Sequence, residues 1–186
     1  MLAPASLRQV HPLGKSPVIT DGAITVAESG AIIEYLVSKY GNGRLLPADG
    51  TAERLRYTYW LHYAEGSAMF PLLMTLVFNF MPRQPMPFFI RPLVRSIAAK
   101  VKSSFIEPQL QLHLGFMEAE LGKAEWFAGS QFTAADIQMS FPLEAAATRG
   151  GLDGQYPRLS AFLKRIHAMP AYQRALEKGG PYELMS

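Results

Sequence analysis

The β-structure that this sequence predicts is confined to one short hairpin near its start. Two runs rich in β-branched residues, 18–20 and 24–26, lie on either side of Asp21-Gly22. This dipeptide is a strong signal for a two-residue turn, because both turn positions are expected to take positive φ. One hairpin in an otherwise helical chain predicts an α+β fold.

The hairpin is followed by a clear helical pattern and then by a break. Apolar residues recur at helical spacing between Ser29 and Tyr40, and Gly41 lies where a C-terminal cap is expected. The stretch from Gly41 to Gly50, GNGRLLPADG, is rich in turn-forming residues and predicts a linker. A short helix is also expected before the hairpin, over residues 5–10.

Residues 51–178 predict helices almost throughout. Long helices are expected over residues 51–80 and 92–121, and further ones begin at Thr133, near Pro157 and near Pro170, the last ending at Gly179. Pro108 should kink the second long helix, because proline lacks a backbone N–H and its ring clashes with the preceding turn. We therefore predict a partial N-terminal domain (1–41), a linker (42–50) and an all-helical domain (51–186).

The helix start at Thr133 carries the sharpest local signal in the chain. In the stretch FTAADI, the Thr133 hydroxyl can cap the helix, and Asp136 can reach back to the Thr133 amide. Phe132 and Ile137 flank this pair as a hydrophobic staple. A buried aspartate beside a threonine also suits a catalytic site, but we favour the structural role. Loss of the cap should then cost about 0.5–2 kcal/mol of stability and leave the chemistry unchanged.

Composition excludes several classes of function. The chain of 186 residues has no cysteine, which excludes a disulfide framework, a thiolate zinc site and a cysteine nucleophile. Its net charge of +3 is too small to indicate nucleic-acid binding. The N-terminus lacks a signal-peptide core, and the longest apolar run, 68–81, is shorter than the ~20 residues of a membrane helix. We expect a cytoplasmic protein without a metal centre, a nucleic-acid partner or a membrane partner.

One segment has an uneven charge distribution. No acidic residue lies between Glu65 and Glu107, but this segment contains Arg83, Arg91, Arg95, Lys100 and Lys102. A local positive field of this kind could attract an anionic ligand or an acidic partner surface. A solvated helix face gives the same pattern, and the sequence alone favours that interpretation.

The stretch between Lys15 and Ser29 carries three features that suit a small zwitterionic ligand. An X-Pro bond tolerates the cis form, which at Pro17 would turn the backbone of Ser16 toward a groove where an extended peptide can pair. Glu28 and Ser29 lie at the start of a helix, whose free amides favour an anion, and Glu28 can accept from an ammonium group. Lys15 adds a cation for a second carboxylate. Taken singly, these features also fit a trans proline at a strand start, a simple helix cap and a solvated lysine.

In combination, these motifs resemble the glutathione transferase family. The N-terminal resemblance is carried by HPLGKSPVI, then DG, then VAESGAIIEYL. This order is similar to the second half of the family's thioredoxin-like domain, especially in bacterial and fungal members with His-Pro-Leu-Gly-Lys-Ser-Pro before the third strand. The C-terminal resemblance is carried by RLRYTYWLHYAEGS, FTAADI and YPRLSAFLKRIHAMPAYQRAL. The resemblance implies a truncated thioredoxin-like domain followed by the family's all-α domain.

The resemblance also implies a binding site for glutathione as co-substrate. Ser16, with Pro17 after it, corresponds to the residue whose backbone pairs with the cysteinyl part of glutathione. Glu28 and Ser29 correspond to the pair that binds the γ-glutamyl head, and Lys15 to a lysine that approaches the glycyl carboxylate. The implied reaction, typical of detoxification, is attack of the glutathione thiolate on a small hydrophobic electrophile.

The electrophile and a second subunit are the further partners that the resemblance implies. The electrophile would lie between the two domains, against a helix whose aromatic residues are Tyr57, Trp60, Tyr63 and Phe70. Aromatic residues at such spacing are more often part of a core. Family members usually form two-fold dimers, in which the hairpin domain contacts the first long helix of the other subunit. Gly66 and Ser67 would permit a close approach there.

The chain departs from the family pattern at its start. The family fold begins with a strand, a helix and a second strand, and the residue that activates the glutathione thiol follows that first strand. No residue here corresponds to it, because Ser6 lies in a different element, and the catalytic residue is therefore unassigned. A two-stranded hairpin is marginal in water and would expose an unpaired edge. We therefore expect the natural protein to carry an additional N-terminal segment.

Three hypotheses about function follow. The first is a glutathione transferase, and the second is a non-catalytic protein of the same fold that binds ligands or serves in dimerisation. The missing activating residue favours the second for the chain as it stands. The third, a helical scaffold unrelated to glutathione, leaves the order of the Lys-Ser-Pro, hairpin and Glu-Ser motifs unexplained.

Overall fold

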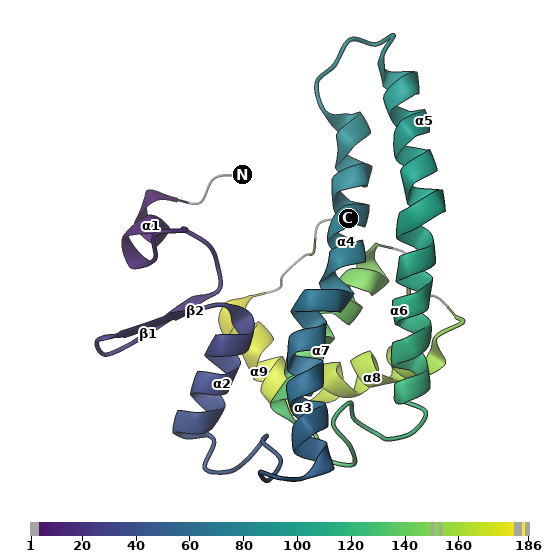
Figure 1. Cartoon of the computed structure of the whole chain (residues 1–186). Coiled ribbons are helices and arrows are strands. Elements are labelled where there is room, and N and C mark those ends of the chain that lie inside the picture. Colours follow the sequence, from purple (N-terminus) through teal and green to yellow (C-terminus); the bar gives the residue numbers. More distant parts are fainter. Residues whose placement is uncertain (1–3, 150, 153, 181–183, 185–186) are drawn as a thin grey trace.

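A computed structural model describes residues 4–149, 151–152, 154–180 and 184 (Figure 1). It has an α+β fold, in which a small N-terminal unit lies beside a larger helical domain. The N-terminal unit consists of α1 (Ala5–Val10), β1 (Val18–Asp21), β2 (Ile24–Ala27) and α2 (Ser29–Tyr40). The helical domain consists of α3 (Ala52–Tyr63), α4 (Met69–Phe80), α5 (Arg91–Val101), α6 (Glu107–Glu120), α7 (Ala134–Thr148), α8 (Pro157–Ala168) and α9 (Pro170–Gly179). The predicted fold class is confirmed.

The hairpin forms where the sequence places it, but its turn is one residue later than predicted. β1 and β2 pair antiparallel, and Asp21 faces Ile24 as the last pair. The turn residues are therefore Gly22 and Ala23. Among the four, only Gly22 takes a positive φ, at 61°, so the expectation of positive φ at Asp21 is wrong.

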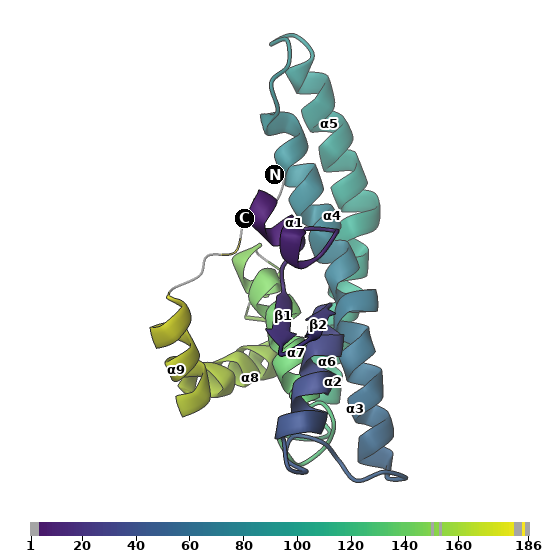
Figure 2. The same ribbon diagram turned by 90° about the vertical axis from the view of Figure 1, so that its left-hand side faces the viewer.

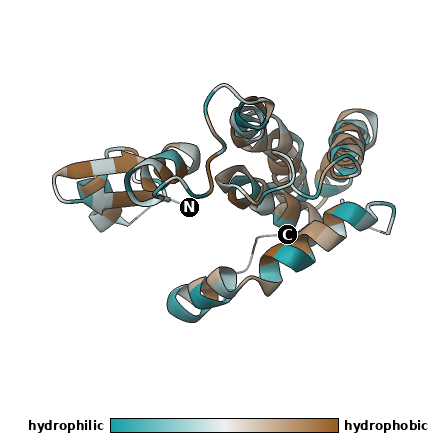
Figure 3. Cartoon of the chain, turned by 90° about the horizontal axis from the view of Figure 1, so that it is seen from below, coloured by the Kyte–Doolittle hydropathy of each residue, from teal (hydrophilic) through white to brown (hydrophobic). Residues whose placement is uncertain are grey.

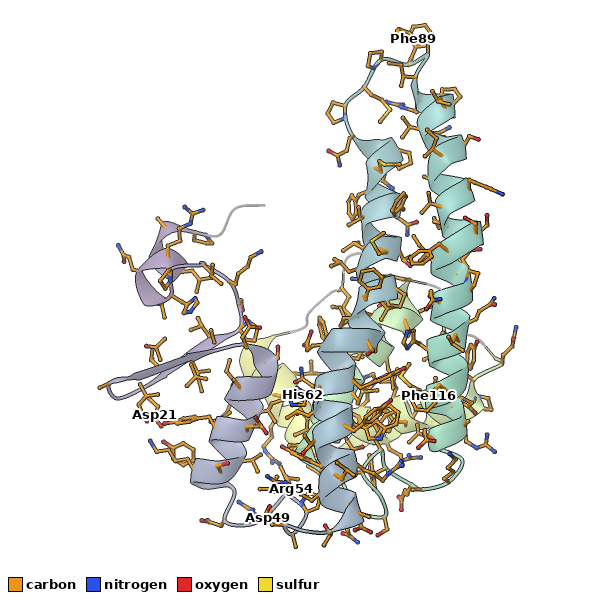
Figure 4. The ribbon with its side chains drawn as sticks, in the orientation of Figure 1. Asp21, Asp49, Arg54, His62, Phe89 and Phe116 are labelled. Carbon is orange, nitrogen blue, oxygen red and sulfur yellow. The ribbon has the colours of Figure 1, made fainter. Side chains whose placement is uncertain are left out.

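The side chain of Asp21 explains its place in the strand. Its carboxylate accepts hydrogen bonds from the Tyr35 hydroxyl at 2.7 Å, from the Lys39 ammonium at 2.7 Å and from the Tyr40 hydroxyl. The bond from Lys39, with those from the two tyrosines, holds the pKa of Asp21 well below its usual range. The cluster ties the end of the hairpin to α2 on the outside of the molecule (Figure 4).

The segment after α2 is packed against the protein rather than loosely tethered. Gly41 ends α2 with a right-handed φ of −72°, not the left-handed cap that was expected. Glycine is required there because a Cβ would lie 2.3 Å from the Val37 carbonyl oxygen. Further on, Leu45 and Leu46 pack against the core, and the Leu45 carbonyl accepts a hydrogen bond from the Ala134 amide at 3.0 Å. The division into domains at this segment stays a prediction.

Both long helices of the prediction are interrupted by a turn of π-helix. The first turn, Ala64–Ala68, joins α3 to α4, and the second, Lys102–Ile106, joins α5 to α6. Each precedes a proline, Pro71 or Pro108, whose ring would clash with the carbonyl four residues earlier in a regular helix. A π turn accommodates that misfit. The distortion expected at Pro108 is thus present as a π turn, whereas the one before Pro71 was not predicted.

The core lies in the helical domain, around α7. This helix buries ten of its fifteen residues and contacts α2, α3, α4 and α8. Its start confirms the predicted capping box, because the Asp136 carboxylate accepts a hydrogen bond from the Thr133 amide at 2.8 Å. Figure 3 shows the N-terminal unit to one side of the bundled helices. The N-terminal unit therefore reaches the core mainly through α2.

One helical stretch, Ala52–Arg83, is long and apolar enough to span a bilayer by length and composition. Its first part carries Tyr57, Trp60 and Leu61, which are buried in the core of the helical domain. A helix that supplies core residues in this way passes the same test. The outer part, α4, pairs with α5 in a long arm that extends beyond the rest of the protein (Figures 1 and 2).

Candidate functional site

A cavity of about 760 Å³ lies between the N-terminal unit and the helical domain. Both units contribute to its wall, so it exists only because α2 packs against α7 and the π turn. The N-terminal unit supplies Leu13, Lys15, Ser16, Pro17, Glu28 and Ser29, and the helical domain supplies Glu65, Ile137, Gln138 and Phe141. The five residues that sequence analysis assigned to glutathione thus share one cavity.

The Ser16–Pro17 peptide bond is cis. It comes immediately before β1, and both residues are exposed at the cavity wall. A cis bond at this point was raised by the sequence as a means of presenting the backbone of Ser16 to an extended ligand. The geometry is consistent with that role.

The opposite part of the wall is the N-terminus of α2. Glu28 has a φ of 74°, a left-handed conformation that is strained for a residue with a side chain. Within the described residues, its side chain makes no capping hydrogen bond to the helix. The first amides of α2 therefore lack the cap that a plain structural role for Glu28 would provide, and they can bind an anion together with the Ser29 hydroxyl.

Glu65 faces this helix start from the helical domain. The π turn places it in the wall, where its carboxylate accepts a hydrogen bond from the Gln138 amide at 2.8 Å. Burial raises the pKa of Glu65, and the negative charge of Glu28 raises it further, while the Ser29 hydroxyl and the Gln138 amide act in the opposite sense. Two carboxylates that repel each other across a cavity form a favourable place for a cation such as an ammonium group.

Sequence analysis missed Glu65 and Gln138 as site residues. Both belong to the helical domain, far in sequence from the hairpin motifs. The available signal was that Glu65 is the last acid before the acid-free segment, placed within an otherwise apolar stretch of helix. A second cavity, of about 480 Å³, shares Glu28, Ser29 and Glu65 and extends the site toward His62 (Figure 4).

The four aromatic residues predicted to contact the electrophile do not line this cavity. Tyr57, Trp60 and Tyr63 are buried in the core cluster of the helical domain, and Phe70 is exposed on α4. The alternative that they belong to the core fits the first three. The apolar wall of the cavity is formed by Leu13, Ile137 and Phe141 instead, and both residues from α7 are partly open. Within the described residues, no group of three or more acids and histidines could hold a metal ion.

Comparison with known proteins follows the division seen in the structure. The family model described as the N-terminal domain of glutathione S-transferase matches residues 2–44, and the model of its C-terminal domain matches residues 86–170. Glutathione S-transferase 3 of Schizosaccharomyces pombe is 35% identical over 176 residues, which cover 95% of this chain and 72% of that protein.

Solved structures show the same relationship. A glutathione S-transferase from Actinobacillus pleuropneumoniae has 31% sequence identity and a TM-score of 0.75, covering 95% of this chain and 74% of that one. A sphingomonad glutathione S-transferase complexed with glutathione has 25% identity and a TM-score of 0.68, covering 94% of this chain and 79% of that one.

Proposed function

Since the chain belongs to the glutathione S-transferase family, we propose that it is a glutathione transferase acting on a small hydrophobic electrophile. In this reaction the glutathione thiolate forms a bond to an electrophilic carbon, and the leaving group departs with its electron pair. The observation that carries the proposal is that one cavity contains both the cis Ser16–Pro17 bond and the uncapped start of α2.

The charges of the cavity match those of glutathione. The γ-glutamyl carboxylate would lie at the first amides of α2 with the Ser29 hydroxyl, where the helix dipole favours an anion. Its ammonium group would lie between Glu28 and Glu65, relieving their mutual repulsion. The cysteinyl backbone would pair with Ser16, and Lys15 would approach the glycyl carboxylate.

The residue that activates the thiol is the open part of this proposal. A thiol has a pKa of about 8.5, so a transferase must stabilise the thiolate. The hydroxyl groups lining the cavity are those of Ser16 and Ser29, and Ser29 is already engaged at the γ-glutamyl head. This favours the second candidate function, a non-catalytic protein of the same fold that binds glutathione or serves in dimerisation.

Replacing Ser29 with alanine is expected to weaken glutathione binding by about ten- to a hundredfold, because a hydrogen bond to a charged carboxylate is lost. Binding would be measured by calorimetry, and turnover by conjugation of chlorodinitrobenzene. Ser38→Ala, an exposed serine on the same helix, should leave the affinity unchanged. Binding with turnover supports the transferase, and binding without turnover supports the non-catalytic protein. If the wild-type protein does not bind glutathione, both proposals fail.

The affinity for glutathione should fall as the pH is lowered from 7 toward 5, because protonated Glu65 cannot hold the ammonium group. The pKa of Glu65 is raised above its ordinary value of 4.5, so part of this loss should appear before a normal glutamate would titrate. Glu65→Gln should bind about tenfold more weakly at pH 7 and should show a flatter pH profile. Glu53→Gln, an exposed acid on α3, is the matched control. An unchanged profile in Glu65→Gln would exclude this role.

A homodimer in the cytoplasm, with a role in detoxification, completes the proposal. The base of α4 exposes Phe70 and Leu73, and no described atom lies within 4 Å of a Cβ built at Gly66. This face is therefore open to the hairpin domain of a second copy, in which Ile24 is also exposed. Sedimentation equilibrium of the wild-type protein tests the dimer directly.

A further inference from the structure

The arm formed by α4 and α5 ends in an exposed tip, here defined as residues 81–95. The tip includes a short 3-10 helix (Met81–Arg83), the loop that follows it and the first turn of α5. Figures 1 and 2 show that it projects beyond every other labelled element, and Figure 4 places Phe89 at its end. The cavity between the two units lies near the base of the arm, beside His62 of the second cavity.

The tip exposes large apolar side chains. Phe88 is 83% exposed, Phe89 68% and Leu93 61%, and Ile90 is also exposed. The two phenylalanine rings contact each other edge to face, with centroids 5.7 Å apart, and pack against little else. Contiguous apolar residues at a projecting end mark a surface that another body covers.

The charges around these residues have a single sign. Arg83, Arg91 and Arg95 lie within the tip, Lys100 follows on α5, and the whole stretch 66–106 contains no acid. In the part of the chain that the structure describes, no ion pair involves these four side chains. The Arg83 guanidinium instead lies over the Phe80 ring at 5.4 Å. The cations are therefore free to meet external anions.

This combination selects among the possible occupants. Two copies meeting through their tips would bring cations against cations, with no acid in the segment to compensate. An acidic protein would match the arginines but not the two exposed rings. A bilayer with anionic lipids matches both, because its phosphate surface attracts cations and its headgroup–acyl boundary accepts aromatic side chains.

We propose that the arm tip docks on the surface of an anionic lipid bilayer. Phe88 and Phe89 enter the boundary between headgroups and acyl chains, while Arg83, Arg91 and Arg95 contact lipid phosphates. The helices of the arm do not cross the membrane, because their bases are fixed in the helical domain. The sequence alone predicted no membrane partner, since the exposure of the tip becomes visible only in the structure. Docking would leave the glutathione cavity, at the base of the arm, in water.

The test is co-sedimentation with vesicles of phosphatidylcholine containing phosphatidylserine, compared with vesicles of phosphatidylcholine alone. The wild-type protein should bind the anionic vesicles, more weakly at high salt. The double variant Phe88→Ser, Phe89→Ser should bind at least about tenfold more weakly. Arg91→Gln with Arg95→Gln should remove the preference for anionic vesicles. Matched controls are Leu55→Ser, an apolar residue 73% exposed at the other end of the arm's first helix, and Arg174→Gln on α9.

Two further measurements keep the result unambiguous. All variants should retain the wild-type thermal unfolding and glutathione affinity, since the tip touches neither core nor cavity. Phe89→Trp should show a blue shift of its fluorescence on adding anionic vesicles. The proposal is overturned if the wild-type protein does not bind these vesicles at low salt or if the double phenylalanine variant binds equally well. It is also overturned if that variant dissociates a dimer in the absence of lipid, since a second copy would then cover the tip.

Discussion

Replacing Trp60 with alanine is expected to lower the free energy of unfolding by about 3–5 kcal/mol, the usual cost of removing a large buried aromatic side chain. Trp60 is only 1% exposed. Its ring stacks on Phe116 with centroids 5.4 Å apart and contacts Tyr63 at 4.9 Å and Phe127 at 4.6 Å. The alanine variant would leave a cavity among these rings. Urea denaturation at pH 7, followed by circular dichroism, measures the loss.

The same variant separates a core role from a substrate role for Trp60. In the core role, stability falls steeply, and Trp60→Phe, which keeps most of the packing, should lose much less. In a substrate role, the alanine variant would keep its stability and lose conjugation selectively. A loss of less than about 1 kcal/mol in Trp60→Ala would contradict the packing described here.

Elements with a complete set of local signals could be predicted from the sequence to within a residue. The helix over residues 29–40 was expected with both ends correct, because an apolar stripe lies between the Glu28–Ser29 start and Gly41. The start of α7 was fixed by Thr133 and Asp136, whose capping partners are three residues apart. In both cases the determining interactions lie within one turn of the chain, so no tertiary information was needed.

Features that depend on contacts between distant segments could not be predicted in this way. The hairpin turn moved to Gly22 and Ala23, and Asp21 remained in the strand, where its carboxylate binds side chains of α2. The π turn before Pro71 also escaped notice, because sequence rules for proline predict a kink but not the form it takes.

The candidate site shows the same limit. Ser16, Pro17 and Ser29 were found because each carries a local backbone signal, and the cavity does bring them together. Glu65 and Gln138 were missed because they reach the cavity only after the helical domain packs against α2. The aromatic residues of α3 have the same spacing whether they face a ligand or a core, and burial alone distinguishes the two.

Replacing Asp136 with alanine is expected to lower the free energy of unfolding by about 2–4 kcal/mol, more than the loss of a helix cap alone. The carboxylate is fully buried and accepts from the Thr133 amide at 2.8 Å, the Thr133 hydroxyl at 2.9 Å and the Phe127 amide at 2.9 Å. The bond to Phe127 was not foreseen, and it ties the preceding loop to α7. Alanine would leave two buried amides without an acceptor, and urea denaturation at pH 7 measures the cost.

The pH dependence of this effect follows from the burial of Asp136. Burial raises its pKa from 3.8 to about 6, and the hydrogen bonds from Thr133 and Phe127 offset only part of that rise. Because the folded pKa lies above the unfolded value, the protein loses stability through this group as the pH rises through about 6. The difference between wild type and Asp136→Ala should therefore be smaller at pH 8 than at pH 5. Asp136→Asn, which cannot ionise, should lack this trend relative to the alanine variant, and a trend of opposite sign in the wild type would show that the carboxylate is stabilised, not destabilised, in its charged form.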